Sequence, residues 1–209
     1  MATPPPITWD QLLPEARTGD LVLFHDGDFL GEAIEVGTGG RFSHSAMIVR
    51  PDPSAAPLIW QESGVALADD PKSKTKHTGA QLGDLRSTVS TILEYHDHPW
   101  YRRLNFDRTP EFEEAVQEVV TTCEGVPFPT ILHMAERWFE GHFLGKAEGN
   151  GEMFCSQLVA LTFQRAGLLS LEHPPNFYSP NSFSMANPHL ALLQGASFDA
   201  EVPIQMDEG

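Results

Sequence analysis

The order of the predicted elements limits the fold of this chain more than any other feature. Short strand patterns fill the first half and amphipathic helix patterns fill the second. Apolar or β-branched runs at 21–24, 43–50 and 58–63 are bounded by glycine and proline, as strands of a sheet are. Strands that precede helices without β–α–β alternation favour an α+β fold with an antiparallel sheet and packed helices.

The strand patterns also predict which side chains share a face. In the run 43–50, alternation places His44, Ala46 and Ile48 on one side. The run 58–63 is the expected hairpin partner of this strand, and residues 89–95 are a further strand candidate. The polar, aperiodic segment 69–79 is predicted to be a loop.

Three helices are predicted in the second half. Thr109 is the expected N-cap of the first, with Pro110 at its first position and an apolar stripe that ends at Cys123. Cys123 is therefore expected to be buried. A second helix is predicted over 130–139, and a third begins near Glu152 and ends at Gly167.

Length and charge restrict the domain organisation and the partners. The 209 residues are divided into an extended N-terminal arm (1–16), one folded domain (17–195) and an acidic C-terminal tail (196–209). Lys+Arg 13 against Asp+Glu 29 gives a net charge of -16, which argues against nucleic acid and anionic membranes as partners. No apolar stretch approaches the ~20 residues of a membrane span and no signal peptide is visible, so a cytoplasmic location is expected.

Only one of the two cysteines is placed for chemistry. Cys155 follows a Gly-Asn-Gly break and falls in the first turn of the third helix, where unpaired N–H groups favour a thiolate. Bringing a thiol from a pKa of ~8.5 to below neutral takes about 2 kcal/mol, and a helix start supplies only about 0.3–1 kcal/mol. A nearby imidazolium is therefore required if Cys155 is a nucleophile. The alternative is a small, inert core residue.

His44 is the candidate partner for that thiol. It begins a strand, from which its ring could reach a helix start across the sheet surface. Glu62 on the neighbouring strand is the candidate that orients the ring, and Gln61, which points to the opposite face, is the fallback. A histidine bonded to backbone and a solvated glutamate are the alternatives for these two positions.

Read in order, these segments resemble a known family. They are Gly19–Phe24, Gly37–Val49 with His44, Trp60–Gly64 with Glu62, Gly125–Phe128, Phe154–Val159 with Cys155, and Tyr178–Pro180. Together they are similar to the circularly permuted papain-like amidases of the YaeF/YiiX group. These amidases are relatives of the NlpC-type cell-wall peptidases and of lecithin:retinol acyltransferase-like enzymes. The similarity runs from about residue 17 to 185, with His before Cys along the chain.

The resemblance implies a papain-like fold and a thiol hydrolase of amide, ester or thioester bonds. Cys155 would be the nucleophile, His44 the general base and acid, and Glu62 the orienting group. It also suggests Tyr178, Ser43 and Asp20 as substrate-binding residues. The expected substrates are peptides, lipid amides or other acylated molecules. Two further hypotheses stay open: a catalytically degenerate module that binds peptide or lipid, and an acyltransferase that uses the same residues.

No metal or other cofactor is predicted. His96 and His98 could share a strand face, but Pro99 follows and no third ligand is near in the sequence. The glycine-rich stretch 37–40 lacks the Gly-Lys-Ser/Thr of a phosphate loop. A cluster of large apolar side chains in the second half either lines an acyl-chain groove, touches a membrane surface or packs in the core: Trp138, Phe139, Phe143 and Leu144.

Overall fold

The computed structural model describes residues 4–25, 40–67, 69, 75–93, 97–147 and 151–206. Its centre is a six-stranded sheet in the order β4-β3-β2-β1-β5-β8, in which every neighbouring pair is antiparallel. The strands are β1 Leu21–His25, β2 His44–Val49, β3 Leu58–Ser63, β4 Gly79–Asp84, β5 Asp97–Arg102 and β8 Val202–Pro203. The predicted α+β class with an antiparallel sheet is confirmed.

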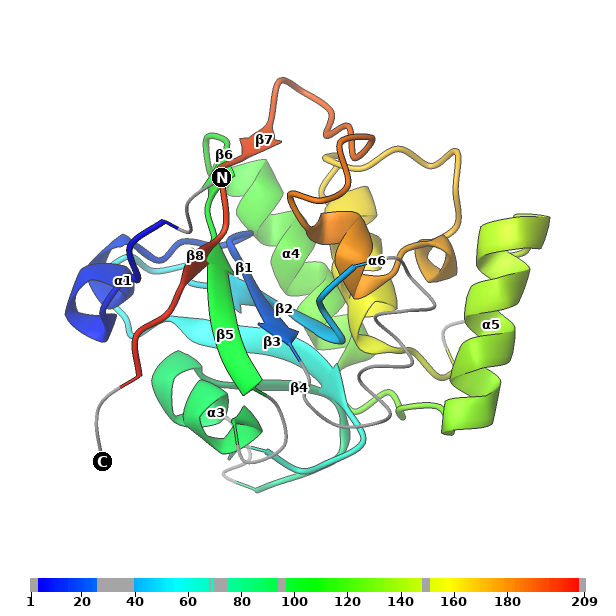
Figure 1. Ribbon diagram of the computed structural model, residues 1–209, viewed down its shortest axis with the longest axis horizontal. Helices are drawn as coiled ribbons and strands as arrows, with labels where there is room; N and C mark the ends of the chain where they lie inside the picture. The colour runs from blue at the N-terminus through cyan, green and yellow to red at the C-terminus, as the bar shows by residue number, and fades with distance from the viewer. Residues whose placement is uncertain are drawn as a thin grey trace.

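Helices cover both faces of this sheet (Figure 1). On one face, side chains such as Met47 and Trp60 pack with α4 (Pro110–Cys123) and α6 (Cys155–Arg165). On the other face, Ala46 and Ile48 pack with α1 (Trp9–Glu15) and α3 (Leu85–Ile92). The two cores follow from the period-two alternation of the strands. The predicted shared face of Ala46 and Ile48 and the predicted pairing of 58–63 with this strand are both confirmed.

The predicted helices are present with shifted ends. The Thr109 hydroxyl accepts the Phe112 N–H at the start of α4, and Cys123 is buried at its end, as expected. The second helix, α5 (Ile131–Leu144), is capped by Thr130 and continues past 139 until Gly145, whose φ of 61° ends it. Helix α6 starts at Cys155 rather than near Glu152, and Gly167 beyond its end has φ +73°.

The strand predicted over 89–95 is wrong. Residues 85–92 form α3, because the Asp84 carboxylate accepts the Ser87 N–H and caps a helix there. Leu85, Val89 and Ile92 are then buried on one side of the helix. In a run this short, apolar residues do not distinguish a helix from a strand. Of the predicted loop 69–79, residues 70–74 lie outside the described residues, as do residues 37–39 of the glycine-rich stretch.

The N-terminal segment is not an extended arm throughout. Thr8 and Gln11 form a capping box, and α1 follows with Trp9 and Leu12 buried against the sheet. The C-terminal segment likewise joins the fold. Its β7 (Ser197–Phe198) pairs with β6 (Leu104–Asn105), and β8 pairs with β5. The domain boundaries at 16 and 195 stay a prediction.

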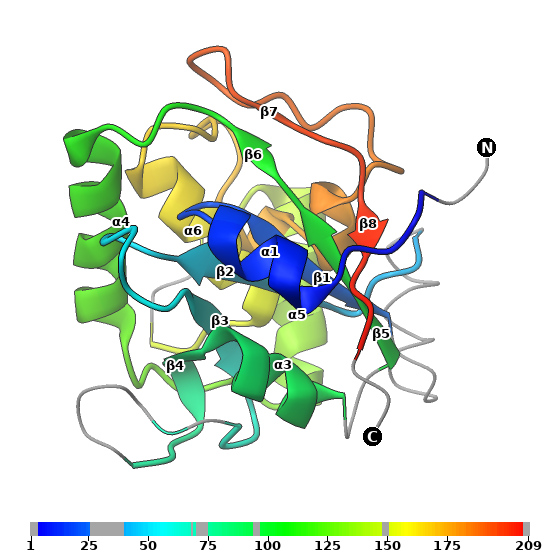
Figure 2. The same cartoon turned by 90° about the vertical axis from the view of Figure 1, so that its left-hand side faces the viewer.

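The two terminal segments also bond to each other. Ile7 forms a parallel bridge with Ile204, and Figure 2 shows the C-terminal segment beside the N-terminal one. The Ile7 N–H donates to the Pro203 carbonyl oxygen, and the Gln205 N–H donates to the Ile7 carbonyl oxygen, each at 2.8 Å. Among the described residues, no helix is long and apolar enough to cross a membrane.

Candidate active site

Cys155 is the first residue of α6 and sits where the helix meets the sheet. Its N-cap, Phe154, has an extended backbone and contributes no side-chain hydrogen bond, so the first N–H groups are not satisfied by a capping side chain. Burial raises the pKa of the Cys155 thiol. The N–H groups of Ser45 and Ser156 and the Ser45 hydroxyl act in the opposite direction and lower this pKa without offsetting the burial. The resting thiol is therefore protonated at neutral pH.

Glu62 lies on the same face of the sheet as that thiol. Its side chain is fully buried, and neither carboxyl oxygen has a hydrogen-bond partner among the described residues. Burial, with a smaller contribution from the negative charge of a Cys155 thiolate, raises the pKa of Glu62 to about 9. Glu62 is thus an uncharged carboxylic acid at pH 7, electrostatically coupled to Cys155.

His44 lies on the other face. Its Nε2 is 3.0 Å from Oε1 of Gln61, and its ring centroid is 5.4 Å from that of Phe24, a member of the core beneath α1 and α3. Ser45, the next residue along β2, faces Cys155 instead. Because successive side chains of a strand point to opposite faces of the sheet, the His44 imidazole and the Cys155 thiol lie on opposite faces.

The structure brings Glu62 and Cys155 together on one face of the sheet and places His44 beside Gln61 on the other. Gln61, the fallback, is the residue that holds His44, and Glu62 does not orient the ring. Alternation explains both facts, since Gln61 and Glu62 are neighbours on β3 and point to opposite faces. The sequence reasoning missed Ser45. The signal was available, because Ser45 shares the parity of Met47, which packs beneath α6.

The three residues suggested for substrate binding fall in different places. Tyr178 is buried beside the start of α6, where its carbonyl oxygen accepts the Ser156 hydroxyl at 2.9 Å. The Ser43 hydroxyl donates to the Phe24 carbonyl oxygen. Asp20 is fully buried at the start of β1 and accepts four hydrogen bonds, from the Leu104 and Arg17 N–H groups, the Arg108 guanidinium and the Tyr101 hydroxyl.

The other sequence candidates are also placed. The apolar cluster of Trp138, Phe139, Phe143 and Leu144 lies on α5. Phe139, Phe143 and Leu144 are exposed, and Trp138 stacks on His142 with a distance of 4.9 Å between the ring centroids. Trp138, Phe143 and Tyr178 line a pocket of about 750 Å³ with residues of η1 (Pro175–Phe177) and η2 (Pro180–Phe183). Within the described residues, no group of three His, Cys, Asp or Glu could hold a metal ion, and His96 lies outside them.

The fold and the site together define an α+β protein with a buried thiol at a helix start and a buried acid facing it. No protein-family model matches the sequence, and no curated protein matches it significantly. Among solved structures, the chain is similar to "metalloprotein yiiX from Escherichia coli O157:H7", with 15% sequence identity and a TM-score of 0.49. The alignment covers 72% of this chain and 66% of that one, just under two thirds of its length.

Proposed function

We propose that the chain is a thiol-dependent hydrolase of amide, ester or thioester bonds, with Cys155 as the nucleophile. The supporting observation is the position of Cys155 at the first residue of α6, where the N–H groups of Ser45 and Ser156 lower the pKa of its thiol against the effect of burial. The same N–H groups would stabilise the oxyanion that forms when the thiolate attacks a carbonyl carbon. When this intermediate collapses, the bond from the carbonyl carbon to the amine, alcohol or thiol of the substrate breaks, and the leaving group takes the proton that was removed from the Cys155 thiol. Water would then hydrolyse the acyl-enzyme on Sγ and regenerate the thiol.

The thiol needs a proton acceptor, and we assign this role to Glu62 in its ionised form. Glu62 faces the thiol. His44 lies on the other face of the sheet with Phe24 and Gln61, and it could accept the thiol proton only if its ring moved to the face of Cys155. Because burial raises the pKa of Glu62 to about 9, its carboxylate, which is the form that accepts the thiol proton, is present mainly at alkaline pH. His44 becomes a positioning residue that fixes the start of β2 through Gln61.

Alkylation tests this assignment with an internal control. Iodoacetamide labelling of Cys155 should rise toward pH 9 relative to that of Cys123, the other free cysteine, which is buried on α4. Glu62→Gln should abolish acyl-enzyme formation at pH 9, because the proton acceptor is lost, and His44→Ala should leave the pH profile of Cys155 labelling unchanged. Rapid labelling at pH 6 that disappears in His44→Ala would overturn the role of Glu62 and favour a Cys155–His44 pair.

A second function is favoured by the burial of the thiol. Cys155 is only 6% exposed, which suits a module that binds peptide or lipid without turnover. Profiling with peptide and acyl-amide libraries separates the two functions, because only a hydrolase yields an acylated Cys155 by mass spectrometry and loses turnover in Cys155→Ala. Equal, slow labelling of both cysteines across the pH range, with no acyl-enzyme, would establish the binding module.

A further inference from the structure

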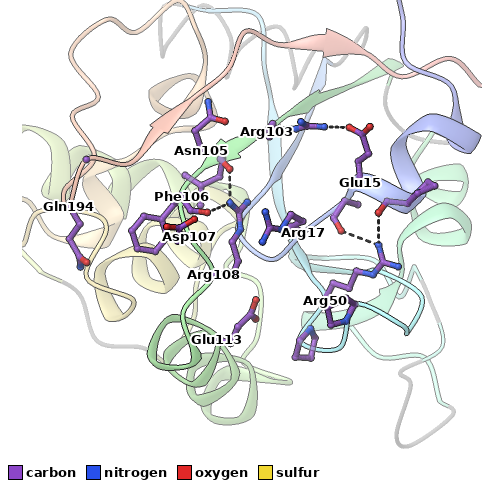
Figure 3. A pocket seen from close by; sticks show the side chains of 16 residues that line it. Glu15, Arg17, Arg50, Arg103, Asn105, Phe106, Asp107, Arg108, Glu113 and Gln194 are labelled. Carbon is purple, nitrogen blue, oxygen red and sulfur yellow. Dashed lines mark hydrogen bonds and ion pairs between the residues drawn. The ribbon is translucent and has the colours of Figure 1, made fainter.

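A second site lies at the opposite end of β2 from Ser45. There the end of α1, the turn after β2 and the segment between β6 and α4 surround a pocket of about 980 Å³ (Figure 3). Arg50, which directly follows β2, is part of its wall. The strand itself separates this pocket from the Cys155 site, so the two sites share no residue.

Four arginines line this pocket, although the whole chain has only 13 Lys and Arg against 29 Asp and Glu. They are Arg17, Arg50, Arg103 and Arg108, all of which are labelled in Figure 3. A chain with a net charge of -16 repels anions at long range. At this pocket, the four guanidinium groups instead concentrate positive charge.

Two of the four charges are already neutralised. Arg108 pairs with the buried Asp20 at 2.7 Å, and Arg103 pairs with Glu15. Burial lowers the pKa of Arg108; Asp20 counteracts this effect, and the charge of the nearby Arg17 adds to it. Arg108 is thus a fixed structural cation whose surroundings already contain a second positive charge.

The other two arginines form no close ion pair with a carboxylate of the described residues, although Arg50 acts electrostatically on Asp52 and Arg17 on Glu113. Arg50 donates through Nε and Nη1 to carbonyl oxygens only, those of Ala55, Leu13, Pro14 and Ala16. Arg17 is exposed, and its guanidinium makes no hydrogen bond or ion pair with the described residues. In Figure 3 the Arg17 side chain lies beside Arg108, on the side toward Arg50.

Carboxyl groups also line the pocket and limit its charge. Glu15 is held by Arg103, whereas Asp107 is exposed. Burial raises the pKa of Glu113 above its ordinary value, with opposing contributions from Thr18, Arg108 and Arg17. Asp52, beyond the wall, is exposed. It accepts hydrogen bonds from Ser54, and the charge of Arg50 makes a smaller contribution to lowering its pKa. The open positive charge of the pocket therefore comes from Arg17 and Arg50.

We propose that this pocket binds a small organic phosphate, with Arg17 as the residue that grips the phosphate group. Two guanidinium groups that form no close ion pair match the two negative charges of a phosphate monoester better than the single charge of a carboxylate. The cavity is far larger than a phosphate ion and has apolar surface from Phe106 and Pro51 for the organic part. The charge of the whole chain disfavours long polyanions such as nucleic acid.

Titration calorimetry with phenyl phosphate at low ionic strength tests the proposal. The wild-type protein should bind it, with an affinity that falls as NaCl is added. Arg17→Gln should bind about tenfold more weakly, since one charge-assisted interaction is lost. Arg165→Gln, which removes the same charge from an exposed position at the end of α6, should bind as the wild type does.

The remaining arms define what would overturn the proposal. Inorganic phosphate should bind more weakly than phenyl phosphate, and benzoate more weakly still. Equal binding by Arg17→Gln, stronger binding of benzoate, or no binding of phenyl phosphate by the wild type would each refute it. Iodoacetamide labelling of Cys155 should be unaffected in Arg17→Gln, so this result is independent of the hydrolase proposal.

Discussion

Two buried carboxyl groups show how different surroundings change the behaviour of one functional group. Asp20 accepts four hydrogen bonds and pairs with Arg108. Glu62 is equally inaccessible and has no hydrogen-bond partner among the described residues. Burial is the largest cause of the raised pKa of both carboxyl groups. Only Asp20 has hydrogen-bond donors that act against this effect and lower its pKa in part. Asp20 is therefore a structural anchor, whereas Glu62 is a group with an unfavourable charged form.

Glu62 makes the stability of the protein fall as the pH rises. Its pKa is raised from 4.5 to about 9, so between these values the folded state holds a proton that the unfolded state has released. The free energy of unfolding should decrease by up to about 1.4 kcal/mol per pH unit in this window. Urea denaturation should find Glu62→Gln more stable than the wild type at pH 8, with a flatter pH dependence.

The matched control for this prediction is Glu118→Gln, at an exposed position on α4. It should keep the wild-type slope. A Glu62→Gln protein that retains that slope would show that Glu62 is ionised in the folded protein.

Asp20 is expected to be among the most sensitive positions. Asp20→Asn leaves the buried Arg108 guanidinium without its counter-charge, which should cost about 3–5 kcal/mol of unfolding free energy. Tyr101→Phe removes only one of the four hydrogen bonds to Asp20 and should cost about 1 kcal/mol. Thermal or urea unfolding measures both, and the opposite ranking would contradict the role of Asp20 as the anchor.

For single residues, the sequence predicted the place of a residue in its helix or strand better than the face of the sheet to which its side chain points. Cys155 at a helix start and Cys123 on a buried stripe were both predictable, because capping and helical periodicity are local. The faces of Gln61 and Glu62 depend on which residue of β3 lies opposite which residue of β2. A shift of one residue exchanges the two faces, and no local pattern in a fully buried strand fixes it.

Among the elements, α1 contributes more than a Pro-rich N-terminus suggests. Leu12 is fully buried beneath the sheet, and Leu12→Ala should lower the free energy of unfolding by about 2–5 kcal/mol. Leu13→Ala, at the half-buried next position, should cost clearly less. Chemical denaturation compares the two, and equal small losses would mean that α1 does not pack on the sheet in solution.

The elements that the sequence missed are those that depend on their neighbours. Strand β4 contains two glycines, β5 contains Pro99, and β8 has only two residues, so none has the composition of a strand. Pairing with β3, β1 and β5 defines them. Elements with strong local signals, such as Thr109 with Pro110 at the start of α4, were predictable to the residue.

For the whole molecule, the net charge of -16 opposes the compact state through self-repulsion. Adding NaCl from low to moderate concentration should therefore stabilise the protein by roughly 1 kcal/mol, or about 2–4 °C in Tm. Differential scanning calorimetry at constant pH measures this shift, with an uncharged osmolyte at equal osmolality as the control. A Tm that falls with NaCl would mean that attractive ion pairs outweigh the repulsion.

The α+β class was predictable at this scale because the order of strands and helices determines it. The strand order was only partly predictable. The hairpin of β2 and β3 is local, whereas placing β1 between β2 and β5 requires contacts across the chain. The same holds for the arginines of the pocket, which come from the end of α1, the end of β2 and the segment before α4.

The bridge between Ile7 and Ile204 has a consequence for biosynthesis. The segment around Ile204 is synthesised long after Ile7, so the hydrogen bonds of Ile7 to Pro203 and Gln205 form only when that later segment has been made. Until then β5 exposes the edge that β8 will cover, and an exposed strand edge invites pairing with other nascent chains. A chaperone that shields this edge during translation would protect the step at which the protein is most vulnerable to aggregation.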